Sequence, residues 1–397
     1  MADAPQQEGR ARTDPLVRSL LKDGSMSADW ADSFEAVPHR AFLPGEFWAF
    51  DMKAGSSVYV SRDDEPDAWE RYAAATNFPL ITQWDDGKHT GREPGRVSTS
   101  SSSEPRVVAG YLRDARISPP MRVLLVGTGT GWDTGLLSYR LGGGNVFSVE
   151  VDAAVTAAAR TRLTALGLHP TVVCADGSLG YSAGAPYDRV IVTAGVRQVD
   201  PALLEQSREG GLILAPWGTH YDNGDALVRL SVGADGSASG PFLRMVEFMK
   251  LRDQRLDWDR FGGHVREFPG DAAVSSTVLT PSDLGERWTS ARFVTGLAVP
   301  DCTHVHNKAN GHIRVRFFGL SDLSWACAEF QPGELTGTVY QHGPRHLWDE
   351  VERALRWWTD QGRPLLDSFG LTVTPTGHSA PGWPTGPTLF RRSPDGP

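Results

Sequence analysis

The sequence predicts an α/β fold, a Rossmann-like doubly wound parallel sheet with an antiparallel hairpin at its edge, followed by a C-terminal α+β domain. An apolar run at 122–126 stops at Gly127, Gly129 and Gly131, and a helical pattern follows; this order is typical of a buried strand, a tight turn and a helix start. Strand-like and helical segments then alternate, which predicts parallel strands joined by crossover helices. After residue 256 the pattern changes to short strand-like pieces between Gly and Pro turns.

The region before the glycine turn is the least regular part of the chain. Residues 1–14 are polar and predict a disordered lead-in, and a helical pattern follows from residue 15. The run at 98–103 contains only Ser and Thr, which by itself predicts a flexible loop. Pro105 after it is suited to the first position of a helix that lasts to about Ala115. Free N–H groups at such a helix start can bind an anion.

The central region predicts the elements of one domain, residues 15–255. We expect strands at 122–126, 145–149, 171–174, 187–193 and 211–215, and helices at 131–141, 152–166 and 201–207. Segments 226–232 and 241–251 flank a Gly/Ser/Asp loop and predict the hairpin at the sheet edge.

The C-terminal region, residues 256–397, predicts an accessory α+β domain that could bind a peptide substrate. Strand-like pieces lie at 313–318, 325–330, 338–341 and 371–374. One helix is expected between Pro344 and Gly362. Its tryptophans, Trp348, Trp357 and Trp358, favour core packing over peptide binding.

Composition narrows the function classes. The 397 residues carry a net charge of −9, which argues against general nucleic-acid or membrane binding. Only three cysteines occur, with neither a disulfide pattern nor paired metal spacing. No signal-like or membrane-length apolar run is present in the sequence, so we expect a cytoplasmic protein. From the cysteine spacing we expect no bound metal. The oligomeric state stays open.

The glycine turn predicts a nucleoside-containing cofactor. Glu150 ends the next strand 23 residues after Gly127, at about the 20-residue spacing where a carboxylate accepts ribose hydroxyls. The glycines follow GxGxG spacing instead of GxGxxG, and Asp176-Gly177 ends the third strand, where it could meet an adenine. Together these features favour S-adenosylmethionine over NAD, the alternative being a turn that binds nothing. The expected cofactor-binding residues are Gly127, Thr128, Gly129, Thr130, Gly131, Glu150, Val151, Asp176, Gly177 and Thr193.

These motifs resemble protein-L-isoaspartate O-methyltransferases over about residues 30–251. The resemblance rests on 123–134, 148–150, 175–177, 186–194, 204–211 and 37–44. It implies a class I methyltransferase fold and a hydroxyl-bearing segment that holds the substrate carboxylate just before a helix. Ser103 takes the key place, with Ser101 and Ser102 beside it, and Glu104 replaces the expected glutamine. The alternative for this serine run is a linker without function.

The C-terminal extension is expected to be absent from the repair enzymes. Segments 347–352, 369–375 and 393–396 resemble the methyltransferases encoded with ATP-grasp peptide maturases. That resemblance implies O-methylation of an aspartate in a ribosomally made, cyclised precursor peptide (a graspetide), followed by aspartimide formation. The alternatives are isoaspartyl repair, lanthipeptide tailoring, and a peptide-binding scaffold without turnover.

Two further signals receive structural interpretations. His304, His306 and His312 could share a metal, but without a nearby carboxylate or cysteine pattern we expect polar surface histidines. Cys174 lies on a predicted buried strand, and we expect it in the core.

Overall fold

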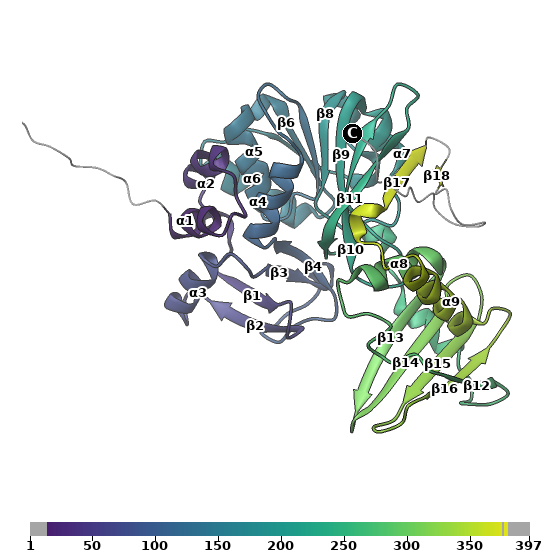
Figure 1. Ribbon diagram of the computed structural model, residues 1–397. Coiled ribbons are helices and arrows are strands. Elements are labelled where there is room, and N and C mark those ends of the chain that lie inside the picture. Colours follow the sequence, from purple (N-terminus) through teal and green to yellow (C-terminus); the bar gives the residue numbers. More distant parts are fainter. Residues whose placement is uncertain (1–13, 375–376, 380–397) are drawn as a thin grey trace, which may run out of the picture. The chain divides into compact units, whose positions relative to one another are not determined.

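The computed structural model describes residues 14–374 and 377–379, and the chain divides into two compact units, 1–189 and 190–397 (Figure 1). Most of the expected lead-in, 1–13, and the resembling segment 393–396 lie outside the described residues. Within the described part, no helix is both long and apolar enough to span a bilayer.

The first unit begins with short helices and a four-stranded antiparallel sheet. The helical elements are α1 (Pro15–Lys22), α2 (Ala31–Ala36), the 3-10 turn η2 (His39–Phe42) and α3 (Pro66–Ala73). The strands are β1 (Glu46–Asp51), β2 (Ser56–Ser61), β3 (Leu80–Trp84) and β4 (Ser98–Ser102), in the order β2-β1-β3-β4. Phe47, Trp69 and Leu80 are fully buried in a core cluster at this sheet.

The expectation of a flexible loop at 98–103 is wrong for residues 98–102, which form β4, and Ser103 lies just after this strand. Its backbone pairs with β3, with Leu80 opposite Ser102 and Ile81 opposite Ser101. Ser100 and Ser102 are buried and their neighbours are more exposed. The composition of the run suggested a loop, whereas pairing with an apolar strand determines its structure.

The parallel part of the first unit confirms the predicted strand–helix alternation. Its strands are β5 (Val123–Val126), β6 (Val146–Glu150), β7 (Thr171–Cys174) and β8 (Tyr187–Val192), and β8 crosses into the second unit. The order is β8-β5-β6-β7, with β5/β6 and β6/β7 parallel. The helices are α4 (Pro105–Asp114), α5 (Trp132–Leu141) and α6 (Ala153–Ala165). Cys174 is exposed rather than buried, because it ends β7, which is the edge strand.

The second unit contains an antiparallel sheet that takes up part of the C-terminal region. After α7 (Pro201–Glu205), its strands are β9 (Ser207–Trp217), β10 (Asp225–Val232), β11 (Ala238–Val246), β17 (Gly370–Thr374) and β18 (Gly377–Ser379), in the order β18-β17-β11-β10-β9. The β10–β11 hairpin is confirmed, but it is not at the sheet edge, because β17 pairs with β11. This pairing accompanies the burial of Leu371 and Val373.

A second, five-stranded antiparallel sheet completes this unit. It has the order β12-β16-β15-β14-β13 and consists of β12 (Ala273–Thr277), β13 (Cys302–Ala309), β14 (His312–Gly319), β15 (Trp325–Phe330) and β16 (Gly337–His342). The unit also contains helices α8 (Ser290–Ala298) and α9 (Leu347–Asp360), and α9 shares a core cluster with the sheet. Helix α9 confirms the predicted helix, whereas α8, β12 and β13 were not predicted. Trp348 is fully buried beside Phe317 in the core, and the Trp358 indole donates to the Pro364 carbonyl at 3.0 Å.

Candidate functional site

The glycine turn between β5 and α5 requires glycine for two reasons. All three residues have positive φ angles, 97° at Gly127, 53° at Gly129 and 93° at Gly131. Residues with a Cβ atom rarely adopt such angles. A Cβ on Gly129 would also lie 3.1 Å from the Ser101 carbonyl oxygen. The turn therefore lies directly against β4, so the structure brings the predicted cofactor loop and the predicted serine segment together.

Glu150 is fixed beside the glycine turn by two backbone donors. The Gly129 N–H donates to Glu150 Oε2 at 3.0 Å, and the Asp152 N–H donates to Oε1 at 3.1 Å. A carboxylate has about four acceptor positions, so both oxygens can still accept the hydroxyls of a ribose. The half-buried carboxylate is therefore held in place before any ligand arrives.

An acidic and an aliphatic side chain lie at the end of each of two strands: Glu150 and Val151 at β6, and Asp176 and Leu179 after β7. Asp176 is exposed, and its Oδ1 accepts from the N–H and the hydroxyl of Ser178 at 2.9 and 2.8 Å, which leaves Oδ2 available. Val151 and Leu179 are 44% and 66% exposed. Two exposed aliphatic side chains beside two acids suit a flat, polar-edged ring such as adenine. Sequence analysis missed Leu179, which has no motif of its own.

The two threonines of the turn point into the protein. Thr128 and Thr130 are buried, and Thr128 Oγ1 lies 2.7 Å from Ser148 Oγ. The predicted role of Thr128 in cofactor binding can therefore involve its backbone groups, because its hydroxyl is bonded to Ser148. Thr193 lies just after β8, in the second unit, and its relation to the turn stays a prediction.

The structure separates the roles of the three serines. Ser102 is 2% exposed, and its hydroxyl lies 2.8 Å from His39 Nε2. Ser101 lies with its carbonyl beside Gly129. Ser103 is half-buried at the end of β4, and within the described part of the chain its hydroxyl has no hydrogen-bond partner. Among the described residues the hydroxyls of Ser101 and Ser103 are thus both available to a ligand, whereas that of Ser102 is bonded.

A half-buried aspartate lies in the first turn of α5, next to the glycine turn. Asp133 bonds to the hydroxyl of Tyr111 from α4, and burial raises the pKa of Asp133 to about 6. Desolvation, more than the tyrosine bond that opposes it, causes this shift. Sequence analysis missed this pair because the two residues are 22 positions apart.

Folding stability should decrease as the pH rises through this pKa. The folded pKa of Asp133 exceeds its unfolded value, so the stabilisation from its protonated form is complete below about pH 4 and lost by about pH 7, on the order of 3 kcal/mol. Asp133→Asn keeps an acceptor for Tyr111 and cannot ionise. We expect urea unfolding midpoints between pH 4 and 7 to vary less in this variant than in the wild type. An unchanged pH dependence would contradict the assignment.

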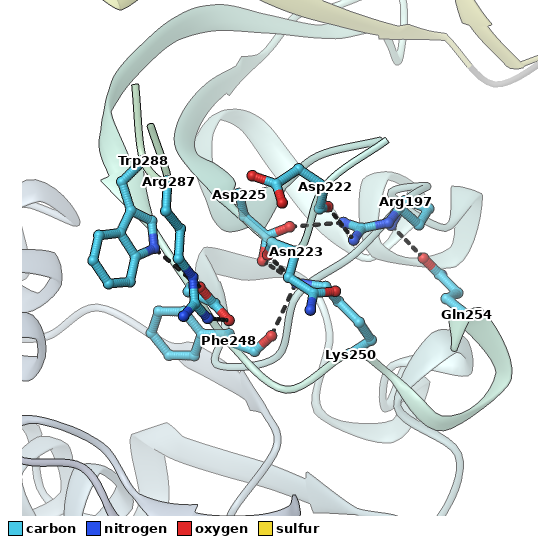
Figure 2. Close-up of polar contacts among 10 residues, drawn as sticks. Arg197, Asp222, Asn223, Asp225, Phe248, Lys250, Gln254, Arg287 and Trp288 are labelled. Atoms are coloured by element: carbon cyan, nitrogen blue, oxygen red, sulfur yellow. Dashed lines mark hydrogen bonds and ion pairs between the residues drawn. The ribbon is translucent and has the colours of Figure 1, made fainter. Parts of the chain in front are cut away.

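A separate charged cluster lies in the second unit (Figure 2). The fully buried Asp225 accepts from Arg197 at 2.7 Å and from Lys250 at 2.5 Å. Lys250 also donates to the carbonyls of Asn223 and Phe248, and burial lowers its pKa despite the opposing field of Asp225. The cluster joins the segments that follow β8, precede β10 and follow β11. Sequence analysis did not single out any of these residues.

The three C-terminal histidines do not gather around a metal. His304 is buried between Tyr221 and Phe317 with Nδ1 2.5 Å from the Tyr221 carbonyl, and burial lowers its pKa to about 3. The expectation of a surface residue is therefore wrong for His304, whereas His306 and His312 are exposed. The described residues contain no group of three potential ligands that could hold a metal ion.

Comparisons with known proteins match the glycine turn and its surroundings. A family model described as Protein-L-isoaspartate(D-aspartate) O-methyltransferase (PCMT) matches residues 82–256. The protein-L-isoaspartate O-methyltransferase of Ignicoccus hospitalis is 40% identical over 204 residues, 51% of this chain and 79% of the relative. The enzyme of the same name from Methylorubrum populi is 36% identical over 222 residues, 56% of this chain and 85% of the relative. The chain belongs to the protein-L-isoaspartate(D-aspartate) O-methyltransferase family.

Membership of this family confirms the predicted fold and cofactor. The chain is an S-adenosylmethionine-dependent protein carboxyl O-methyltransferase with a class I fold. A solved chain titled protein-L-isoaspartate O-methyltransferase aligns over 96% of this chain and 99% of its own length, with a TM-score of 0.53 and 20% identity. At this identity the similarity concerns the fold alone, and the expected absence of a C-terminal extension from the repair enzymes is not confirmed.

Proposed function

We propose that this family member methylates an aspartate side chain in a ribosomally synthesised, cyclised peptide of the graspetide class, and that the ester then closes to an aspartimide. The observation that supports a carboxylate substrate is the Ser103 hydroxyl, which has no hydrogen-bond partner among the described residues. Ser103 directly follows a strand whose backbone lies against Gly129. Support for the peptide class comes from the sequence resemblance of 347–352 and 369–375.

Glu104 favours a substrate different from that of the repair enzymes. It occupies the place of the expected glutamine, it is half-buried, and burial raises the pKa of its carboxyl. A carboxyl next to the proposed carboxylate-binding serine changes both the charge and the hydrogen bonding of that surface. This departure supports a specialised substrate, with isoaspartyl repair as the alternative.

The residues around the glycine turn would hold S-adenosylmethionine, which supplies an electrophilic methyl group. We propose backbone contacts from Gly127, Thr128, Gly129, Thr130 and Gly131, ribose contacts from Glu150, and adenine contacts from Val151, Asp176 and Gly177, with Thr193 completing the set. The fit rests on the positive φ angles of the turn and on the fixed Glu150 carboxylate.

The chemistry requires placement more than proton transfer. A carboxylate is already nucleophilic at pH 7; one of its oxygens would bond to the methyl carbon as the carbon–sulfur bond breaks. The Ser103 hydroxyl would donate a hydrogen bond to the other oxygen and align the group. Such alignment can be worth roughly 7–11 kcal/mol in the best cases.

Replacement of Ser103 should separate turnover from cofactor binding. We expect Ser103→Ala to lower kcat/KM for a carboxylate substrate about 10- to 100-fold, since one hydrogen bond to a charged group is worth roughly 1.5–3 kcal/mol. The affinity for S-adenosylhomocysteine, measured by calorimetry, should stay at the wild-type value. Ser100→Ala, on the same strand, is the matched control. Wild-type turnover in Ser103→Ala would remove Ser103 from this role.

The proposed substrate can be tested against its alternatives in one assay. The enzyme is incubated with an isoaspartyl peptide, a lanthipeptide and a multicyclic graspetide precursor, and each peptide is analysed by mass spectrometry. We expect methyl transfer to the graspetide, followed by loss of methanol that leaves the peptide one water lighter. Methylation of the isoaspartyl peptide alone would establish the repair alternative.

We also propose a division of labour along the chain. Residues 15–255 would form the methyltransferase domain, and 256–397 an accessory region that binds the peptide. The β17–β11 pairing attaches the end of this accessory region to the sheet that contains the β10–β11 hairpin.

A further inference from the structure

His39 is a buried histidine with a bonding partner at each ring nitrogen. Its Nδ1 lies 2.9 Å from the Ala73 carbonyl and its Nε2 lies 2.8 Å from the Ser102 hydroxyl. The ring is 3% exposed, and burial lowers its pKa to about 4, so it is neutral at pH 7. A carbonyl can only accept, so Nδ1 holds the proton and Nε2 accepts from the Ser102 hydroxyl. The tautomer is therefore set by Ala73.

The same ring also contacts the helix that follows the glycine turn. The centroids of His39 and Trp132, the first residue of α5, are 4.4 Å apart. The Trp132 indole donates to the Val37 carbonyl at 2.9 Å. A Cβ on Gly135 would lie 2.9 Å from Phe42 and 3.0 Å from Val37, so residues 37–42 pack directly on α5. His39 thus touches both the serine strand and the start of α5.

We infer that His39 is a positioning residue for methyl transfer, which sets the distance between Ser103 and the glycine turn through its hydrogen bond to Ser102. This inference rests on the proposed function, because it takes Ser103 and the glycine turn as the two sides of the reaction. His39 does not reach the reacting atoms. It holds the strand that presents Ser103.

The chemistry makes this distance important. Methyl transfer requires the attacking oxygen, the carbon and the leaving sulfur in line, and a misplacement of about 1 Å can cost roughly 100-fold in rate. Ser102 is adjacent to Ser103, so a shift of Ser102 moves the Ser103 hydroxyl with it. The Ser101 carbonyl opposite Gly129 provides a steric limit but no bond across this gap. The His39–Ser102 hydrogen bond supplies a directional contact.

A second buried contact holds the other end of the same segment. Tyr111 on α4, the helix that follows Ser103, bonds to Asp133 in the first turn of α5. Loss of the His39 contact should therefore release β4 locally without detaching α4 from α5.

Two replacements of His39 separate its two hydrogen bonds, and both remove the ring that contacts Trp132. An asparagine amide can reproduce the donor at Nδ1 and keep Ala73, but it is too short to reach Ser102. A glutamine amide can reach the position of Nε2 and accept from Ser102. We expect His39→Asn to lower kcat about 10- to 100-fold with an unchanged affinity for S-adenosylhomocysteine, and His39→Gln to recover most of kcat.

A double-mutant cycle with Ser102→Ala tests the path. If His39 acts through Ser102, the double variant His39→Asn/Ser102→Ala should be no slower than the slower single variant. Fully multiplicative losses would overturn the inference. Tyr187→Phe is the matched control, because it also loses one buried hydrogen bond to a carbonyl, at Tyr181, away from the serine strand. We expect it to keep the wild-type kcat.

Hydrogen exchange gives a readout that needs no substrate. Backbone amides of 98–103 should exchange faster in His39→Asn than in the wild type, His39→Gln or Tyr187→Phe. Unchanged exchange at 98–103 would overturn the positioning role. So would equal losses of kcat in His39→Asn, His39→Gln and the control Tyr187→Phe. A wild-type enzyme that methylates no carboxylate peptide would overturn the proposed function, and the exchange result would still decide whether His39 holds the strand.

Discussion

Glu150→Ala should weaken S-adenosylmethionine binding about 100-fold, close to 3 kcal/mol, because two hydrogen bonds to a charged acceptor are lost. The loss has a second source within the protein. Glu150 accepts from the Gly129 and Asp152 N–H groups, so its removal leaves the turn without its internal acceptor. Calorimetric titration with S-adenosylhomocysteine measures the effect directly.

The control for Glu150 is a carboxylate that also accepts from a backbone N–H group but lies away from the glycine turn. Asp14 caps α1 by accepting from the Leu16 N–H at 2.8 Å. Asp14→Ala should cost some stability and leave cofactor affinity at the wild-type value. An affinity in Glu150→Ala within about twofold of the wild type, or under ~0.4 kcal/mol, would show that Glu150 is not a ribose ligand.

Asp225→Ala should destabilise the second unit by about 3–5 kcal/mol. Asp225 is fully buried between Arg197 and Lys250, so its removal leaves two buried cations without their carboxylate (Figure 2). Gly195 and Gly218 pack so closely on Asp225 that a Cβ on either would lie 2.6 or 2.8 Å from a carboxylate oxygen. Little space remains for rearrangement. Urea unfolding followed by circular dichroism measures the change.

An exposed aspartate provides the comparison for Asp225. Asp235 lies in the β10–β11 loop and accepts from Ser237. We expect Asp235→Ala to unfold at nearly the wild-type urea concentration. If Asp225→Ala unfolds there as well, the buried cluster does not stabilise the unit.

The cofactor side of the site was predictable because its signals are local. The turn at 127–131 requires glycine, Glu150 ends β6, and Asp176 follows the end of β7 by two residues. Parallel strands with crossover helices place their carboxyl ends at one edge of the sheet. The spacing of these residues along the chain was therefore enough to predict that they lie close together.

The serine side was predictable only in part. The resemblance indicated Ser103, but composition suggested a loop where the structure has β4. The partner of Ser102 is His39, 63 residues earlier, and no periodicity connects the two. Long-range contacts of this kind depend on the packing of whole elements, which a single motif does not encode.

In the C-terminal region, too, local features could be predicted from the sequence and long-range contacts could not. Helix α9 follows from its apolar face and its turn residues. The pairing of β17 with β11 joins segments about 130 residues apart, and the burial of His304 depends on Tyr221 and Phe317 from other elements.

The sequence by itself determined the strand–turn–helix unit, the acid at the end of each following strand, and the class of cofactor, because backbone conformation and hydrophobic period act over a few residues. Only the tertiary structure decided that Ser103 is available while Ser102 is bonded, that His39 connects β4 to α5, and that Asp225 is buried between two cations. The physical reason is that burial and hydrogen-bond partners are set by which distant surfaces pack together, and that packing is a property of the folded chain.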